Sequence, residues 1–557
     1  MRIKRKPVVL TIALVLTVAL LAQPALAFQR PAVPGSEGMV TANNPITAQV
    51  GYDILKEGGN AVDAIVAMAK VNGIVEPWIS GPGGSGFGMV YMAEEDEVSY
   101  LEFSGVAPEK LSLDHFPDGI PYRCEKGLTA LIPGTVMGWE VMREEYGTMS
   151  REALYEPAIE KGRYGYPAYS RMAGNLQWHF DGSWFDDHNG LGHRTWSAWP
   201  RDPVETGSLI WNANMARTYE RIAEEGVEVF YGGEIGQEMV DFMQDIGGVW
   251  EIEDLENYEA TWMEPVHTTY RDYDIYAAPP NCSGGIALAQ IMNIVELYDI
   301  EEMGVNSADY LHIFNEAIKL AVADRAEWIA DPDWLDIPID ELTSKEYAKE
   351  QNERIDMDEA MPLPDPGKER PGGTTNFTAV DQDGNMASIV QSNGGGWGTG
   401  LILGDTGVHI NNGVAWMEDD PESVNVVEGG KRSRWNMTPV MVFDDGESRL
   451  VTGGLGGTQI WQNIPQVLVK VLDFGKNMQE AISSPRTTYQ MGAGEGYLTR
   501  IEDRVDEEVI EELEERGHVV DHAAGGVAHI NGVFLHPVTG SLIGGSEPRI
   551  GGHTMGW

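Results

Sequence analysis

A proline-rich segment divides the sequence into two parts with different secondary-structure patterns. The segment, residues 356–373, contains four prolines between residues 362 and 371 and ends in Gly372-Gly373. Proline fixes its own φ and has no amide N–H, so regular helices and strands are not sustained there. The part before it is rich in helical periodicity, and the part after it begins with alternating strand patterns. Strands combined with helices in this way indicate an α+β layered architecture.

Helix boundaries are indicated by capping residues. Asn44-Pro45 begins a helix that runs to Glu57, Gly58-Gly59 ends it, and Asn60 begins a second helix over residues 61–72. Further helices are expected at 212–225, 234–245, 285–297, 307–330 and near 507–514, and strands at 88–92, 376–380, 386–391, 406–411, 439–443, 450–453 and 533–536.

The N-terminus has the pattern of a secretory signal peptide. A basic stretch, Arg2–Lys6, precedes the apolar run 8–22, and Ala25-Leu26-Ala27 supplies a cleavage site. An uncleaved membrane anchor is the alternative, although the run is shorter than the roughly 20 residues of a bilayer span. No later segment is long and apolar enough to span. We therefore expect residues 1–27 to be removed and the protein to be extracytoplasmic, periplasmic or secreted, without stable membrane insertion.

The charge of the chain is strongly negative. Its 87 acidic and 38 basic residues give a formal charge of −49, which repels nucleic acid and anionic lipid and excludes both as partners. A saline habitat and an unusually acidic extracytoplasmic protein both remain as explanations. Only Cys124 and Cys282 are present, so at most one disulfide can form.

Thr374 follows the proline-rich segment directly and is a candidate nucleophile. A hydroxyl needs an adjacent base, and the α-amine of the same residue, which titrates near pH 8, can serve once the preceding bond is cut. Gly373 adds no side chain to obstruct that attack. Taken alone, Gly-Thr-Thr before a strand is also an ordinary turn. Residues 178–199, which carry three histidines among aromatics, are either a metal site or an aromatic loop over a cleft.

Many motifs, collinear from about residue 37 to the C-terminus, resemble the gamma-glutamyltransferase family. They include Gly58-Gly59-Asn60-Ala61-Val62-Asp63-Ala64, Val75-Glu76-Pro77, Ile132-Pro133-Gly134-Thr135-Val136, Ser283-Gly284-Gly285, Thr374-Thr375, Asp383-Gly384-Asn385, Asn411-Asn412, Met437-Thr438-Pro439, Gly456-Gly457 and Pro548-Arg549. The resemblance implies a four-layer αββα sandwich of the N-terminal nucleophile hydrolase type. It also implies self-cleavage between Gly373 and Thr374 into a large subunit, 28–373, and a small subunit, 374–557, which associate as a heterodimer.

The resemblance also implies the catalytic roles. Thr374 would attack a small-molecule amide and form an acyl-enzyme, which water or an acceptor amine resolves without metal or organic cofactor. Gly456 and Gly457 match the pair whose N–H groups stabilise the oxyanion, a tight turn being their alternative interpretation. Thr375 and Ser392 would support the nucleophile, Ser392 through a hydroxyl hydrogen bond.

The expected substrate pocket departs from the family pattern. A γ-glutamyl group needs a cation for its α-carboxylate and an acid for its ammonium. Ser104 stands near the place of the family arginine, Trp435 and Asn436 replace two serines, and Gly413 and Trp416 replace acidic or amide residues after Asn412. Glu418 or Asp419 could serve if the loop is shifted, and Arg432 and Arg434 are either substitute anion binders or surface charges.

Three functions follow from this pattern. The family favours γ-glutamyl hydrolysis or transpeptidation on glutathione-like amides. The altered pocket favours an amidohydrolase or acylase with a non-glutamyl acyl donor. An inactive binding protein on the same fold is the third interpretation, against which the retained Thr374, Ser392 and paired glycines argue.

Overall fold

The computed structural model describes residues 30–124, 126–181, 197–199, 203–364, 372–491 and 497–557. The expected signal peptide and most of the aromatic stretch 178–199 lie outside the described residues. No helix of the described part combines the length and the hydropathy needed to cross a bilayer.

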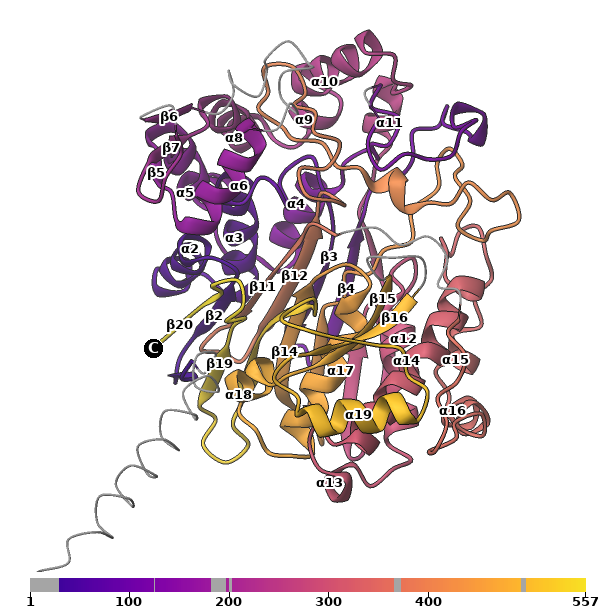
Figure 1. Cartoon of the computed structure of the whole chain (residues 1–557). Coiled ribbons are helices and arrows are strands. Elements are labelled where there is room, and N and C mark those ends of the chain that lie inside the picture. Colours follow the sequence, from indigo (N-terminus) through magenta and orange to yellow (C-terminus); the bar gives the residue numbers. More distant parts are fainter. Residues whose placement is uncertain (1–29, 125, 182–196, 200–202, 365–371, 492–496) are drawn as a thin grey trace, which may run out of the picture.

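Two seven-stranded antiparallel sheets form the centre of the molecule (Figure 1). The first sheet has the order β1 (Val33–Gly35), β19 (Leu542–Gly545), β18 (His529–Leu535), β14 (Glu447–Leu455), β13 (Val440–Asp444), β10 (Tyr273–Ala277) and β9 (Val266–Tyr270). The second has the order β20 (His553–Gly556), β2 (Met39–Ala42), β11 (Thr374–Val380), β12 (Met386–Ser392), β3 (Ser85–Met92), β4 (Glu97–Phe103) and β8 (Thr261–Met263).

Helices cover the outer face of each sheet, which gives the predicted four layers (Figure 1). Against the second sheet lie α2 (Pro45–Lys56), α3 (Ala61–Val75) and α4 (Thr135–Tyr146), with α5 (Arg151–Tyr164) and α8 (Ala213–Glu225) packed beyond them. Against the first sheet lie α12 (Gly284–Val295), α17 (Gln459–Leu472) and α18 (Met478–Ser483), and α14 (Ala308–Trp328) packs on α12.

The remaining elements are shorter or peripheral. They are α6 (Ser170–Asp181), α9 (Glu228–Tyr231), α10 (Glu234–Asp245), α11 (Ile252–Glu256), α13 (Ile300–Met303), α15 (Ile339–Leu342), α16 (Lys345–Asn352), α19 (Glu507–Glu515), the 3-10 turns Leu113–His115 and Gly413–Trp416, and two small sheets made of β5 (Tyr166–Pro167), β6 (Ser197–Trp199) and β7 (Leu209–Trp211), and of β15 (Thr487–Met491), β16 (Tyr497–Glu502) and β17 (Val520–Ala523).

Apolar side chains fill the space between the layers. Met89 and Tyr100 of the second sheet and Phe443, Val451 and Val533 of the first belong to one buried cluster between the sheets. Two larger clusters lie under the helices on either side. Burial of apolar surface in these three layers is the main force that stabilises a layered fold of this kind.

Strands from before and after Thr374 are interleaved in both sheets. In the first sheet β1, β9 and β10 precede it and the other four strands follow it; in the second, β11, β12 and β20 belong to the later part. A cut before Thr374 would therefore leave each fragment hydrogen-bonded within both sheets.

Most predicted elements are confirmed, and capping explains why. The Asn44 side chain accepts from Thr47 N at 2.8 Å, and Asn60 forms a capping box with Asp63. The predicted strand at 406–411 is wrong: the chain there makes only isolated bridges. Gly404 and Gly407 adopt φ of 56° and 76°, which turns this stretch into a loop. Both cysteines are free.

Candidate active site

Thr374 is the first residue of β11, in the middle of the second sheet. It pairs with Ser392 at the end of β12, and its side chain is buried, with 4% of the residue exposed. The Thr374 hydroxyl donates to Ser392 Oγ at 3.2 Å. The sheet register therefore places the hydroxyl that the sequence predicted beside its candidate nucleophile.

Ser392 Oγ contacts both partners of the predicted cleavage reaction. It donates to the carbonyl oxygen of Gly373 at 2.7 Å and accepts from Gly394 N at 2.8 Å. Gly373 N in turn donates to Gly394 O at 2.7 Å. One hydroxyl thus links the attacking oxygen to the carbonyl of the bond before it, and the Gly394 turn holds that hydroxyl in place.

The glycines of the junction lie against two backbone segments, the predicted oxyanion loop and the turn that follows Ser392. Gly456 and Gly457 lie between β14 and α17, with φ of 138° and 64°. A β-carbon on Gly372 would lie 2.8 Å from Gly457 N, and one on Gly373 would lie 2.6 Å from the Gly395 carbonyl carbon. Only glycine allows these approaches. The backbone at the start of α17 also favours negative charge, as an oxyanion requires.

Thr375 lies on the opposite side of β11 from Thr374, because successive strand residues alternate. Its hydroxyl accepts from Asn43 Nδ2 at 2.7 Å, and Asn531 Nδ2 donates to Asn43 Oδ1 at 2.7 Å. Asn43 and Asn531 were not predicted as site residues. Asn43 precedes the helix-capping Asn44, and Asn531 lies within β18, but neither position in the sequence predicts a contact with β11.

Asn412 and Trp416 contact the Gly394 turn. Asn412 Oδ1 accepts from Gly395 N at 2.6 Å and so holds the turn. The Trp416 indole nitrogen lies 3.2 Å from the position of a β-carbon on Gly394. The centroids of the Trp416 and Trp435 rings are 6.2 Å apart, and both residues are buried. Asn412 and Trp416 therefore lie beside the turn that follows Ser392, and Trp435 lies next to Trp416.

Ser104 and Asn436, unlike Asn412 and Trp416, are held by buried polar groups outside the Gly394 turn. The Ser104 hydroxyl donates to Glu102 and accepts from Asn281 Nδ2 at 3.0 Å, and the same nitrogen donates to Ser433 O at 2.7 Å. Asn436 Oδ1 is held in the interior by Ser283 Oγ at 2.8 Å and by an indole N–H. Sequence reasoning missed Asn281 and Ser433 as neighbours of this region.

Several buried polar atoms of this region have no hydrogen-bond partner among the described residues. They include Trp416 Nε1, Trp435 Nε1, Asn281 Oδ1, Ser433 Oγ and Asn393 Oδ1. Buried polar groups are normally paired, so unpaired ones beside a reactive group are candidates for contact with a ligand.

Arg432 and Arg434, the two arginines that the sequence singled out, are paired with acids. Arg432 pairs with Glu102 and Asp331, both at 3.1 Å, and Arg434 pairs with Glu418 at 2.5 Å. The interpretation of Arg434 as a surface charge is wrong, because only 1% of its side chain is exposed. One carboxylate oxygen of Glu418, the predicted ammonium-binding acid, is therefore engaged by Arg434.

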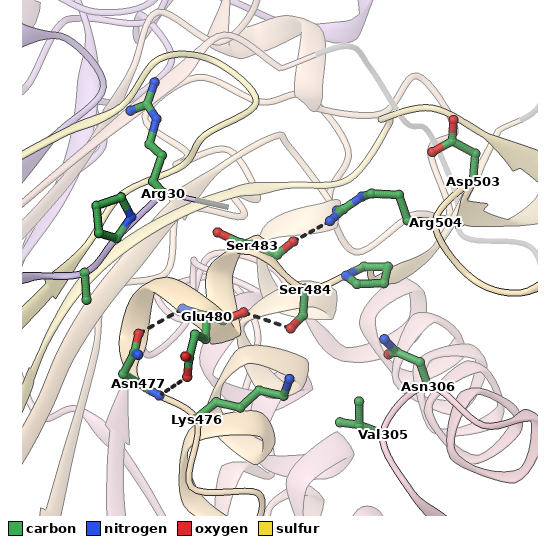
Figure 2. Close-up of a pocket in the computed structure, with 13 residues that line it drawn as sticks. Arg30, Val305, Asn306, Lys476, Asn477, Glu480, Ser483, Ser484, Asp503 and Arg504 are labelled. Carbon is green, nitrogen blue, oxygen red and sulfur yellow. Dashed lines mark hydrogen bonds between the residues drawn. The ribbon is translucent and has the colours of Figure 1, made fainter. Parts of the chain in front are cut away.

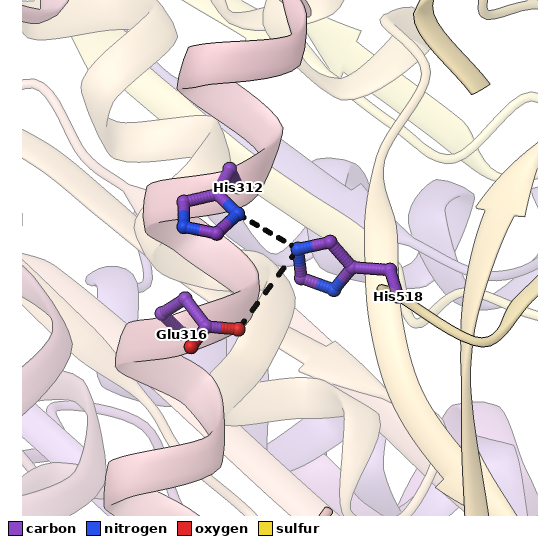
Figure 3. Close-up of side chains that lie close together, drawn as sticks. All are labelled: His312, Glu316 and His518. Carbon is purple, nitrogen blue, oxygen red and sulfur yellow. Dashed lines mark hydrogen bonds and ion pairs between the residues drawn. The ribbon is translucent and has the colours of Figure 1, made fainter. Parts of the chain in front are cut away.

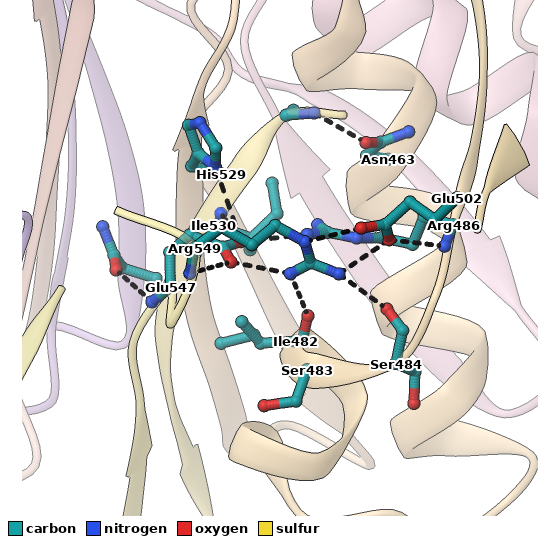
Figure 4. A network of polar contacts seen from close by, with 12 residues as sticks. Asn463, Ile482, Ser483, Ser484, Arg486, Glu502, His529, Ile530, Glu547 and Arg549 are labelled. Atoms are coloured by element: carbon teal, nitrogen blue, oxygen red, sulfur yellow. Dashed lines mark hydrogen bonds and ion pairs between the residues drawn. The ribbon is translucent and has the colours of Figure 1, made fainter. Parts of the chain in front are cut away.

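Buried arginines and glutamates of the small C-terminal elements form an ion network (Figure 4). Arg549 pairs with Glu547 at 2.6 Å and with Glu502 at 2.7 Å, and Arg486 pairs with Glu547 at 2.9 Å. Burial raises the pKa of Glu547, but the charges of Arg549 and Arg486 outweigh it and lower that pKa to about 2. Glu547 N donates to Asn531 Oδ1, which connects the network to Asn43 and Thr375.

A large cavity lies elsewhere, where α18 meets the chain at Arg30 (Figure 2). It has a volume of about 1090 Å³, and none of the predicted site residues lines it. Its lining mixes Arg30, Lys476 and Arg504 with Glu480 and Asp503, so its charges largely cancel.

Two antiparallel sheets between helical layers, with a buried threonine at the start of a central strand, define the N-terminal nucleophile hydrolase class. The Gamma-glutamyltranspeptidase family model matches residues 47–557. The chain is 35% identical over 540 residues to the glutathione hydrolase proenzyme of Escherichia coli (strain K12), covering 93% of this chain and 91% of the relative. It is 30% identical over 537 residues to the acylase ACY 1 proenzyme of Pseudomonas sp. (strain V22), covering 94% of each.

A solved structure extends the comparison. The cephalosporin acylase from Bacillus halodurans superposes with a TM-score of 0.87 at 29% identity, covering 95% of this chain and 97% of that chain. The chain belongs to the gamma-glutamyltranspeptidase family, and it is an enzyme of the hydrolase and transferase type that this family comprises. The predicted family and fold are therefore confirmed.

Proposed function

We propose that the protein is an N-terminal-threonine amide hydrolase that cleaves itself between Gly373 and Thr374. Export through residues 1–27 and this cleavage would leave a large subunit, 28–373, and a small subunit, 374–557. The observation that carries the proposal is the hydrogen-bond bridge from Thr374 Oγ1 through Ser392 Oγ to Gly373 O. The interleaved strands would keep the two subunits together as a heterodimer.

Self-cleavage needs only groups that meet at this junction. Thr374 Oγ1 forms a bond to the Gly373 carbonyl carbon, the carbon–nitrogen bond breaks, and the hydroxyl proton goes to the departing amide nitrogen. Ser392 donates a hydrogen bond to the carbonyl oxygen as negative charge develops there. Water then hydrolyses the resulting ester and frees the Thr374 hydroxyl and α-amine.

Turnover repeats this chemistry on an external amide. The α-amine accepts the hydroxyl proton, Thr374 Oγ1 attacks the substrate carbonyl, and the acyl-enzyme is released by water or by an amine. The N–H groups of Gly456 and Gly457 stabilise the oxyanion, with Thr375 and Ser392 supporting the nucleophile. This sequence of steps requires neither metal nor organic cofactor.

The acyl donor that the site favours lacks the α-amino and α-carboxylate groups of γ-glutamate. The neighbouring cations Arg432 and Arg434 are paired with acids, and Glu418 is paired as well. The unpaired donors are instead the neutral indole N–H groups of Trp416 and Trp435. A charged substrate group facing them would lose its hydration without gaining an ion pair, which costs a few kcal/mol. An acylase-type activity on a neutral acyl group is therefore our first candidate.

A γ-glutamyl donor, with glutathione-like substrates, is the second candidate. The 35% identity to a glutathione hydrolase proenzyme favours it. On this alternative the chain would bind the glutamyl α-groups through residues other than those at the matching positions.

A matched series of anilides separates the two candidates. Processed enzyme is assayed on γ-glutamyl, glutaryl, 4-aminobutanoyl and butanoyl anilides, which remove the α-amine, the α-carboxylate, or both. We expect the γ-glutamyl anilide to be turned over more slowly than butanoyl anilide. The γ-glutamyl compound being fastest would reject the acylase assignment.

The cleavage proposal is tested separately. Wild-type protein should show two fragments on a denaturing gel, the smaller beginning at Thr374, and Thr374→Ala should remain a single chain. A cleaved Thr374→Ala variant would refute the nucleophile assignment.

A further inference from the structure

Three metal-ligand side chains meet in the interior, outside the active site (Figure 3). His312 and Glu316 lie one turn apart on α14, and His518 follows α19. One ligand atom from each residue lies within 4.8 Å of the others, and all three residues are buried. Among the described residues this is the one group of three such side chains with that spacing.

The distances are close to those of a tetrahedral site. His312 Nδ1 is 2.9 Å from His518 Nε2, and Glu316 Oε1 is 3.9 Å from the same nitrogen. Bonds of 2.0–2.1 Å from zinc place neighbouring ligand atoms about 3.3 Å apart. The two measured distances therefore lie on either side of that spacing.

The surrounding contacts orient two of the three ligands. His312 Nε2 lies 2.9 Å from Asp356 O, so Nε2–H donates to that carbonyl and the Nδ1 lone pair faces the cluster. Glu316 Oε2 accepts from Met361 N at 2.8 Å, which leaves Oε1 toward the histidines. His518 Nδ1 has no partner among the described residues. It can take the proton that Nε2 releases on binding a metal.

The cluster offers two imidazole nitrogens and one carboxylate oxygen. Neutral imidazole paired with one carboxylate is a donor set typical of zinc and related transition metals.

Lys319 opposes metal binding and so limits its affinity. Its ammonium donates to Glu316 Oε1 at 2.7 Å and to Met361 O at 3.0 Å. A metal on the same carboxylate oxygen would have to displace this hydrogen bond or lie beside a positive charge. Removing the Lys319 charge should therefore tighten a metal site, whereas it would only weaken a purely structural ion pair.

We propose that His312, Glu316 and His518 bind a transition-metal ion of the zinc type. The ion also fixes the segment that leads to the cleavage junction, because Asp356 and Met361 contact two of its ligands. If the chain is cut before Thr374, the ion joins the large subunit, through α14, to the small subunit, through His518. This last consequence rests on the proposed cleavage, whereas metal binding does not.

Calorimetric titration with ZnCl₂ tests the site. Protein without a histidine tag is first stripped with a chelator, and the Thr374→Ala variant is titrated beside wild type so that binding is measured independently of cleavage. We expect one saturable site in both, at least tenfold weaker in Glu316→Gln and His518→Ala, and at least tenfold tighter in Lys319→Met. His115→Ala, which changes an exposed histidine, is the matched control and should bind as wild type does.

Two outcomes would overturn the proposal. One is that the stripped wild-type protein is folded, as a cooperative melting curve shows, but binds no zinc saturably. The other is zinc binding whose affinity is unchanged in Glu316→Gln and Lys319→Met. Melting curves of each stripped variant show that it is folded, and Co²⁺ absorption bands of a tetrahedral site, present in wild type and absent in His518→Ala, give a second measurement.

Discussion

The hydroxyl of Ser392 should control the rate of self-cleavage, and Ser392→Ala isolates its contribution. In the intact chain this hydroxyl is the hydrogen-bond donor to the Gly373 carbonyl, at 2.7 Å, and the acceptor for Thr374. The carbonyl oxygen becomes an oxyanion when Thr374 attacks, so the bond that alanine removes strengthens in the transition state.

The expected magnitude follows from loss of one such donor. Removing a single oxyanion donor slows acyl transfer by about 10²–10³, or about 3–4 kcal/mol. Because Gly394 N also loses its acceptor, the turn that holds Gly373 should loosen as well. We expect Ser392→Ala to cleave at least 100-fold more slowly than wild type, and Ser392→Thr, which keeps the hydroxyl, to stay within about tenfold of it.

The assay is a time course of precursor loss on denaturing gels after refolding or translation. Ser388→Ala is the matched control, because Ser388 is buried on the same face of β12 but its hydroxyl contacts Asn376 and not the junction. Cleavage of Ser392→Ala at the wild-type rate, or equal slowing in the Ser388 control, would refute the reasoning.

Further predictions concern the oxyanion loop, the tryptophans and the ion network. Gly456→Ala should reduce turnover at least tenfold, measured on the best anilide, because φ of 138° is strained for alanine and its β-carbon would lie 3.0 Å from the Ala528 α-carbon. Trp435→Ala should lower kcat/KM for the preferred acyl group at least tenfold without improving it for an unrelated one; equal loss on every substrate would argue for a structural role. Glu547→Gln should lower stability in denaturant titrations by about 3–5 kcal/mol, since it leaves two buried arginines short of a partner. The pKa of Glu547 is lowered to about 2 in the folded protein, below its ordinary value of 4.5. The ionised carboxylate therefore stabilises the folded state fully above pH 4.5, and this stabilisation is lost as pH falls toward 2. The free energy of unfolding of the wild type should fall between these pH values, and that of Glu547→Gln should fall less.

The sequence predicted the helix caps and a strand directly after the glycine-rich junction because both depend on local signals. Asn44 and Asn60 cap their helices, and the glycine-rich junction precedes a strand, as the sequence indicated. The strand predicted at 406–411 failed because two glycines with positive φ override its apolar residues. Motif resemblance, rather than periodicity, supplied the sheet arrangement.

Long-range pairing is what the sequence did not predict. Arg432 forms an ion pair with Asp331, and Arg434 donates to the backbone carbonyl of Arg325, in each case across about a hundred positions, so these contacts have no local signature. Asn281 and Ser104 meet although 177 residues separate them. Ser104 follows β4 and Asn281 follows β10, strands of different sheets, so their contact arises only when the two sheets pack.

Burial of Thr374 serves both stages of the proposed reaction. Before cleavage, burial holds the Thr374 hydroxyl and the Gly373 carbonyl against Ser392. Only 4% of Thr374 is exposed, and the strand register pairs it with Ser392. After cleavage the same burial acts on a new α-amine, and desolvation disfavours the charged ammonium relative to the neutral amine. The neutral amine is the form that accepts a proton from the hydroxyl. In the proposed reaction the interleaved strands would stay paired after the cut, so the site that made the break would be retained for turnover.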